Sequence, residues 1–449
     1  MLEKLFKIKE RGSSVRTEII AGITTFLAMA YILAVNPGLM AKAGISMGAA
    51  FSATAISAGI ATLCMAFFAN YPVALASGMG LNAFFAVVCT EMGFSYQVAL
   101  TAILIEGIFF MVLSLFKFRE ALVNKIPNNL KFGITAGIGL FITIIALLNS
   151  GIVVASEATT VALAEDISSP TVVLPLVGLI IIGVLHHFKV PGAILLGILA
   201  TWGMGMLAEV GGWYVPDPAK ELYSTIPSFS GDSFAAPLWC EFDFGFIAKN
   251  AFSFFVIVFT FLYTDIFDTV GTLIGVAEKG NLLDKDGRLP KAGGALMADA
   301  VGTTVGAILG TSTVTSYVES SAGVSAGGRT GLASVVTAGL FFLSLVLAPV
   351  FTAIPGFATA PAMIFVGLLM LSSVKKIDFD GDVADTIGAF LAIVIMPFTY
   401  SIANGIMFGM LAWVILKILT GKIKQVSGVM WISVALFVVY IVLKVKGLA

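Results

Sequence analysis

The sequence predicts an all-α polytopic membrane protein. Of its 449 residues, 59% are hydrophobic and 11% are charged, whereas soluble domains carry roughly 45 to 50% apolar residues. Apolar runs close to the roughly 20 residues that a membrane helix needs follow one another along the chain. Because only helices and closed barrels satisfy their backbone polar groups in lipid, these continuous, non-alternating runs favour helices.

The apolar runs divide into two equal groups. Seven precede the end of a long loop near residue 245, and seven more extend from there to about residue 420. An odd number in each half inverts the second half relative to the first. We therefore predict fourteen transmembrane segments in two inverted repeats, residues 19–245 and 246–420, after an N-terminal segment of residues 1–18.

Lysine and arginine indicate which side of the membrane is cytoplasmic. If the segments alternate, the basic stretches share one side: Lys4–Arg16, Lys117–Lys131, Lys279–Lys291, Lys375–Lys376 and Lys417–Lys424. Loops on the other side, Asn149–Pro170 and Gly211–Gly245, hold one lysine between them. We expect a multi-pass protein of the cytoplasmic membrane, and the positive-inside rule places its N-terminus on the cytoplasmic side.

The C-terminal residues 421–449 contain an additional apolar stretch, Val429–Leu443. It is apolar enough to cross the membrane, but crossing would place Lys444 and Lys446 outside, against the charge rule. Whether this stretch crosses or lies along the inner face stays open.

Two segments, one in each half, are interrupted. "GIATLCMAFFANYPVALASGMGLNAFF" begins at Gly59, and "DAVGTTVGAILGTSTVTSYVESSAGV" begins at Asp299. Each is a helix rich in small residues that breaks into a short stretch of strand formers with Pro, Gly, Ser or Thr, and then resumes. Paired interrupted segments in inverted repeats indicate a transporter site near the bilayer midplane.

Acidic side chains inside apolar segments are the candidate functional groups, since an ionised one at the bilayer centre costs at least about 2.5 to 3.5 kcal/mol. The second break contains Glu319, between a strand-like run and a helix that we expect to be capped by Ser320 or Ser321. Freed backbone groups persist in lipid only where they line a cavity or meet protein. Glu319 is therefore predicted to face a polar cavity.

Four further carboxyl groups lie in apolar surroundings. Asp265 and Asp268 are three residues apart on one helical face, and small residues after Asp268 make it the stronger candidate. Asp299 begins the helix that leads into the second break, where it acts as a proton relay or as a structural acceptor, two alternatives that stay open. Glu106 is interpreted as a residue that forms a hydrogen bond between two helices.

The ligand follows from the available donors and acceptors. Carboxylates accept hydrogen bonds from ligand N–H groups, and the first break offers exposed backbone at Gly78 and Gly80 and the amide of Asn82. Acidic groups disfavour an anion, so a small, neutral, planar heterocycle fits best. Because burial favours the neutral form of a carboxyl group, the predicted coupling ion is a proton, with sodium as the alternative.

Long motifs give the chain a resemblance to the nucleobase/ascorbate transporters, within them the adenine, guanine and hypoxanthine permease branch. They are "PVALASGMGLNAFFA", "DIFDTVGTLIG", "NLLDKDG", "GTSTVTSYVESSAGVSAGGRTGL" and "APAMIFVGLLML". The resemblance implies core and gate domains and short antiparallel strands in segments 3 and 10. It also implies import of purine bases by proton symport with alternating access, and a homodimer through the gate domain, with no cofactor and no nucleic-acid partner.

The resemblance also implies roles for individual residues. Asp268 takes the position of a substrate-binding glutamate in the eighth segment, with Thr272 as a nearby polar position. Glu319 takes that of the tenth-segment carboxylate, beside the backbone of Val318, and Met79 lies where the third segment's strand meets the base.

Two further positions complete the predicted site. Asp299 matches an acidic residue tied to coupling, a role we also assign to Asp268 and Glu319. Thr25 stands where xanthine relatives carry a histidine. The predicted substrate-binding set is Asp268, Glu319, Val318, Thr272, Met79, Gly80, Asn82 and Thr25.

Three alternatives are weaker. An intramembrane aspartyl protease would need paired carboxyls such as Asp268 and Asp299, but the Gly-x-Gly-Asp setting is missing and the inverted repeat is unexplained. An anion carrier of similar fold would bind its ligand at helix N-termini, which Glu319 disfavours. Metal binding by "DKDGR" or "DFDGD" fails because glycine falls at the wrong offset for a calcium loop, and we interpret both as solvated turns.

Overall fold

The computed structural model describes residues 2–115, 127–156, 159–217, 224–226, 234–282 and 289–445. Within this part of the chain, ten helices are long and apolar enough to cross a membrane, and three shorter apolar helices accompany them. The prediction of an all-α polytopic membrane protein is confirmed.

The described residues of the first half form seven membrane segments, one of them the successive helices α2 and α3 and one a strand followed by a helix. Its elements are α1 (Leu2–Phe6), α2 (Val15–Met29), α3 (Ile32–Lys42), α4 (Met47–Phe68), β1 (Leu75–Ser77), α5 (Met79–Thr90), α6 (Tyr96–Leu115), α8 (Asn128–Asn149), β2 (Val153–Ser156), β3 (Thr160–Leu163), α9 (Pro170–His187) and α10 (Ala193–Val210). Strands β2 and β3 form a hairpin that the sequence prediction treated only as a loop.

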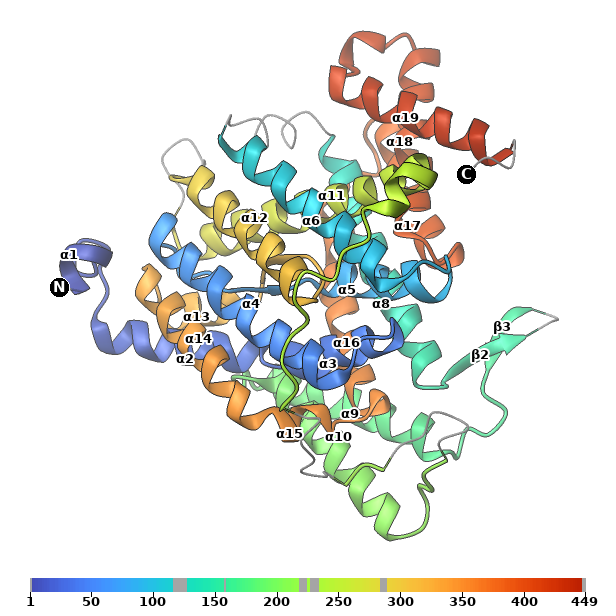
Figure 1. Ribbon diagram of the computed structural model, residues 1–449. Coiled ribbons are helices and arrows are strands. Elements are labelled where there is room, and N and C mark those ends of the chain that lie inside the picture. Colours follow the sequence, from blue (N-terminus) through green and yellow to red (C-terminus); the bar gives the residue numbers. More distant parts are fainter. Residues whose placement is uncertain are drawn as a thin grey trace.

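The second half also contributes seven segments, followed by one more helix. Its elements are α11 (Gly245–Lys279), α12 (Ala292–Leu309), β4 (Val314–Ser316), α13 (Ser320–Ser325), α14 (Gly331–Ser344), α15 (Ala348–Thr352), α16 (Gly356–Leu371), α17 (Val383–Phe398), α18 (Ile402–Leu419) and α19 (Gly428–Val445). The apolar stretch near the C-terminus is thus helical, and α19 packs on α18, away from the N-terminus (Figure 1).

Contacts between the helices separate them into two sets, the core and gate domains of the prediction. In the core, α12 packs on α4 and α6, and α14 packs on α2 and α4; Figure 1 shows α4, α12 and α14 side by side. In the gate, α17 packs on α8 and α18, and α16 packs on α8 and α9. Each set takes helices from both halves of the chain.

Glycines allow the gate helices to pack closely. A Cβ atom added at Gly139 of α8 would lie 2.6 Å from the carbonyl oxygen of Gly367 in α16, and a Cβ at Gly367 would lie 2.6 Å from the carbonyl oxygen of Gly139. Small residues at such contacts are the usual means by which membrane helices approach one another.

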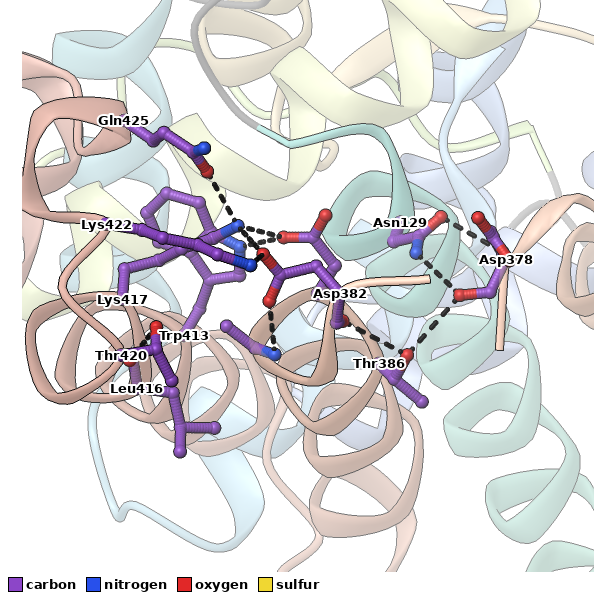
Figure 2. Close-up of polar contacts among 12 residues, drawn as sticks. Asn129, Asp378, Asp382, Thr386, Trp413, Leu416, Lys417, Thr420, Lys422 and Gln425 are labelled. Atoms are coloured by element: carbon purple, nitrogen blue, oxygen red, sulfur yellow. Dashed lines mark hydrogen bonds and ion pairs between the residues drawn. The ribbon is translucent and has the colours of Figure 1, made fainter. Parts of the chain in front are cut away.

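An ion-pair cluster ties the start of α17 to the end of α18 (Figure 2). Lys417 Nζ lies 2.7 Å from Asp382 Oδ2 and 3.3 Å from Asp385 Oδ1, and it donates to Gln425 Oε1 at 2.9 Å. Lys422 Nζ lies 2.8 Å from the same Asp382 oxygen. The hydrogen bonds from both lysines hold the pKa of the Asp382 carboxyl well below its usual range. The cluster therefore corrects one prediction, because Asp382 of "DFDGD" is ion-paired and does not belong to a solvated turn.

This cluster predicts unequal effects for two lysines that bind one oxygen. Lys417 is 3% exposed and Lys422 is 46% exposed. Breaking a buried pair costs about 3 to 5 kcal/mol, whereas exposed pairs contribute roughly 0 to 1 kcal/mol. We expect Lys417→Gln to lower the unfolding temperature in detergent markedly and Lys422→Gln to change it little. Equal losses in both variants would contradict this account of the cluster.

Candidate functional site

The two interrupted segments meet in a pair of short strands. β1 and β4 pair antiparallel, with Leu75 opposite Ser316, Ala76 opposite Thr315 and Ser77 opposite Val314. Backbone hydrogen bonds from Gly78 to Thr313 and from Tyr317 to Ala74, both 3.0 Å, extend the pairing. Backbone groups freed by each break are thus satisfied by the other break, as the interior of a membrane protein requires. The predicted strands in segments 3 and 10 are confirmed, and we call this region the crossing.

Helices α5 and α13 both begin at the crossing. Glu319 occupies the N-cap position of α13, but its side chain makes no capping hydrogen bond. The expectation that Ser320 or Ser321 caps this helix is wrong. Ser320 is instead the first helical residue, and its Oγ accepts a hydrogen bond from the backbone N–H of Ala74 at 3.0 Å, which fixes the start of α13 to the chain leading into β1.

The carboxylate of Glu319 is held by a tyrosine that the sequence prediction did not include. Tyr31 lies between α2 and α3, is 1% exposed, and donates from Oη to Glu319 Oε1 at 2.6 Å. The ring of Tyr317 lies 6.4 Å from that of Tyr31, and its hydroxyl donates to the carbonyl of Ser77. Within the described ranges, the salt bridges do not include Glu319. Among the described residues, Glu319 is therefore held by a neutral hydroxyl group and not by a cation.

Asp268 of α11 lies beside the crossing, close to the residue that follows β1. A Cβ atom added at Gly78 would lie 3.6 Å from Asp268 Oδ2, and Asp268 lies close enough to Glu319 and to Asp299 for their charges to act on it. Thr272 follows one turn later and is 9% exposed. The structure thus brings together two carboxyl groups that lie 51 positions apart in the sequence (319 − 268).

A threonine connects the remaining carboxyl groups. Thr269 Oγ1 lies 3.0 Å from Asp265 Oδ1, 2.7 Å from Asp299 Oδ1 and 2.6 Å from Thr315 Oγ1. Asp299 lies in the middle of α12 and does not begin it, contrary to the sequence prediction. The network therefore joins α11, α12 and β4 directly behind the strand pair.

Other predicted residues border the crossing in different ways. Thr25 packs against α13, where a Cβ atom at Gly323 would lie 2.0 Å from its Oγ1, and Gly80 faces Ile138 of α8. Met79, the first residue of α5, is 5% exposed. The side chain of Val318 is 46% exposed and lies beside Glu319 in the chain.

Two buried polar residues fasten the chain before β4. Asn82 Oδ1 accepts from Ser312 Oγ, and Asn82 Nδ2 donates to Ser77 O at 3.3 Å. Glu106 Oε2 accepts from Thr313 Oγ1 at 2.8 Å, so this hydrogen bond reaches the segment before β4 rather than another helix. Both residues hold the approach to the second strand in place.

The described part of the chain holds no group of three His, Cys, Asp or Glu side chains suited to a metal ion. The "DKDGR" turn lies outside the described residues.

Comparison with solved structures identifies the fold. The transmembrane domain of a cyanobacterium bicarbonate transporter, BicA, matches with a TM-score of 0.66 and 14% identity, covering 87% of this chain and 97% of that chain. SLC26A9 matches with a TM-score of 0.64 and 11% identity, covering 93% of this chain and 68% of that chain. These similarities show the fold of two inverted seven-segment repeats.

Comparison with known sequences identifies the family. The model of the Permease family matches residues 16–408. The adenine permease AdeP of Escherichia coli (strain K12) is 40% identical over 98% of this chain and 96% of its own length. The guanine/hypoxanthine permease PbuO of Bacillus subtilis (strain 168) is 42% identical over 96% and 98%. The chain belongs to the nucleobase/ascorbate transporter family, and it is a multi-pass transporter rather than an enzyme.

The hydroxyl of Tyr31 provides a test of the site. A hydrogen bond to a charged group contributes about 1.5 to 3 kcal/mol, so Tyr31→Phe should weaken transport by roughly tenfold or more while the protein still reaches the membrane. The matched control is Tyr263→Phe, which removes a buried hydroxyl bonded to Ser433 of α19 and should leave uptake near the wild-type rate. Normal uptake by Tyr31→Phe would show that this hydrogen bond does not position Glu319.

Proposed function

We propose that this protein imports purine bases across the cytoplasmic membrane by proton symport and alternating access, with its N-terminus inside. The observation that carries the proposal is the meeting of Glu319 and Asp268 at the crossing, beside hydroxyl groups and without a recorded ion pair among the described residues. Relatives of similar length are named as adenine permeases and as guanine/hypoxanthine permeases.

The chemistry of the crossing favours a purine. A carboxylate offers two acceptor oxygens, which match a ligand edge that presents two neighbouring N–H donors, such as N1–H and the amino group of guanine. The backbone N–H groups of Met79, Gly80 and Leu81 precede the first helical hydrogen bond of α5, which Asn82 donates to Gly78, so they have no partner within the helix and can donate to ring nitrogens or carbonyl oxygens. Val318 and Thr272 extend the proposed contact set around the base.

Hydrogen counting in the Thr269 network supports a bound proton. One hydroxyl hydrogen cannot serve three oxygen neighbours. If Thr315 donates one hydrogen to Thr269 and Thr269 donates one to a carboxylate, the third contact needs a hydrogen on Asp265 or Asp299. We therefore propose that Asp299, Asp268 and Glu319 exchange the coupling proton, with Thr269 as the link between α11 and α12.

Alternating access would use the boundary between the two helix sets. Ile138 of α8 occupies the space that a side chain at Gly80 of α5 would need, since its Cγ2 lies 2.6 Å from the position of an added Cβ atom. The core and the gate therefore touch beside the crossing. A base held at the crossing would thus be covered by the gate. Movement of one set past the other would open it to each side in turn.

An anion carrier is the competing function. The bicarbonate transporter BicA shares the fold, but at 14% identity its substrate does not transfer to this chain. Two carboxyl groups at the crossing would repel an anion at close range. The purine proposal is consistent with these charges, and the anion proposal is not.

The first test removes the charge of each carboxyl group. Glu319→Gln and Asp268→Asn should reach the membrane at normal levels and lose most uptake of radiolabelled guanine, hypoxanthine or adenine, by about 100-fold for a lost charged contact. Cells lacking their own purine permeases provide the background. Glu91→Gln, at an exposed position after α5, is the matched control and should transport normally. Wild-type uptake by either site variant would refute the assigned site.

A second test addresses the coupling ion. Addition of a purine to de-energised cells should make the medium more alkaline, because each base carries a proton inward. Thr269→Val, which removes one hydroxyl at nearly constant shape, should reduce this signal. Uptake that is indifferent to pH and to an uncoupler, or that requires sodium, would exclude proton symport while leaving purine transport intact.

A further inference from the structure

A polar cavity lies beyond the ends of several elements that lead to or from the crossing. Its volume is about 350 Å³, and its lining includes Arg11 before α2, Tyr71 between α4 and β1, Leu282 after α11 and Arg329 after α13. Sites for small molecules occupy roughly 300 to 1,000 Å³. The cavity is therefore large enough for an organic anion and is not only a space for single waters.

Two guanidinium groups give this cavity a positive charge. Arg11 Nη1 donates to the carbonyl oxygens of Asn70 at 2.8 Å and Arg329 at 3.1 Å. Arg329 Nη1 donates to the carbonyl oxygens of Val324 and Gly328, both at 2.7 Å. These neutral acceptors orient each guanidinium without cancelling its charge. In the part of the chain that the structure describes, the salt bridges include neither arginine.

One neighbouring carboxylate, Glu18, can offset at most one of these two positive charges. Glu18 accepts from the backbone N–H groups of Arg329 at 2.9 Å and Thr330 at 3.2 Å, so its oxygens serve the backbone. The guanidinium carbon of Arg11 lies 5.8 Å from the centre of the Tyr71 ring. A guanidinium has five N–H donors, and the recorded hydrogen bonds of both arginines use only Nη1.

We propose that this cavity binds a phosphoryl group. The planar donor fork of arginine matches phosphate oxygens, and the unesterified oxygens of a phosphate monoester or diester are enough for two guanidinium groups at once. The Tyr71 ring and Leu282 provide an apolar wall for whatever carries the phosphate. The carrier is either a soluble phosphate ester or a phospholipid headgroup, since both present the same chemistry.

Binding here would act on the elements that carry the proposed transport site. Leu282 follows α11, which bears Asp268, and Arg329 follows α13, which begins after Glu319. A ligand that binds only this arrangement stabilises it by mass action. Such binding can be measured without any transport, so its failure and the failure of the proposed function are distinguishable.

The experiment uses the full chain purified in detergent and depleted of lipid. Inorganic phosphate, added at constant ionic strength against chloride, should raise the unfolding temperature saturably. Arg11→Gln and Arg329→Gln should each weaken the apparent phosphate affinity by about tenfold or more. Arg16→Gln, an exposed arginine in the first turn of α2, should bind phosphate as the wild type does.

A second arm identifies the carrier and covers poor folding of the variants. The unfolding temperature of the protein is compared in vesicles of phosphatidylglycerol and of phosphatidylcholine. If phosphatidylglycerol stabilises the protein through both arginines and free phosphate has no effect, the carrier is a lipid headgroup. Arg11→Lys and Arg329→Lys, which keep the charge but lose the donor fork, should bind more weakly than wild type if the Gln variants do not fold. Absence of stabilisation by either ligand, or equal stabilisation in wild type and all four variants, overturns the proposal.

Discussion

The antiparallel pairing of β1 with β4 is the interaction on which the rest of the molecule depends. Each strand interrupts a membrane segment and frees backbone groups that would cost several kcal/mol apiece if left unpaired in lipid. Pairing two breaks from opposite halves satisfies both at once. It also fixes where α5 and α13 begin, and so determines the position of Glu319 relative to Met79.

Charge is handled differently at the crossing and at the gate. At the gate, Asp382 is bound by Lys417 and Lys422, and the cluster joins the start of α17 to the end of α18 (Figure 2). At the crossing, Glu319 is bound by the hydroxyl of Tyr31 and Asp299 by that of Thr269. Neutral hydroxyl groups orient a carboxyl group without forming an ion pair with it. The carboxyl group can therefore still bind a base or a proton.

Those features that depend on local pattern could be predicted from the sequence. Apolar runs gave the segment number, and the break around Glu319 was visible because Gly, Ser and Thr interrupt an apolar run. The short antiparallel strands in segments 3 and 10 were expected from the family resemblance, and the structure confirms them. The hairpin of β2 and β3 was missed although "VVASEATTVAL" is rich in β-branched residues, which was a usable signal.

Features that depend on distant contacts could not be predicted in this way. Tyr31 stands in an apolar run with nothing local to mark it, and its partner is 288 positions away. Ser320 was expected to cap a helix, but its hydroxyl oxygen instead accepts a hydrogen bond from the backbone N–H of Ala74, which is distant in the sequence. Lys417 was used only as part of a basic stretch that marks the cytoplasmic side, and only the packing of α17 on α18 shows that it is buried. Thr269 was noted only as a small neighbour of Asp268. Its contacts with α12 and β4 could not be predicted, because the sequence of α11 alone does not show which elements pack against it.

Protection of a cysteine at the crossing measures the central claim most directly. Val318→Cys, in a chain with Cys64 and Cys89 replaced by serine, places a thiol beside Glu319, and exposed Cys240 serves as the internal control. If a base occupies the crossing, a saturating purine slows alkylation at position 318 by about tenfold and leaves the rate at Cys240 unchanged. Equal alkylation of residue 318 with and without purine, in a variant that still transports, would contradict the account.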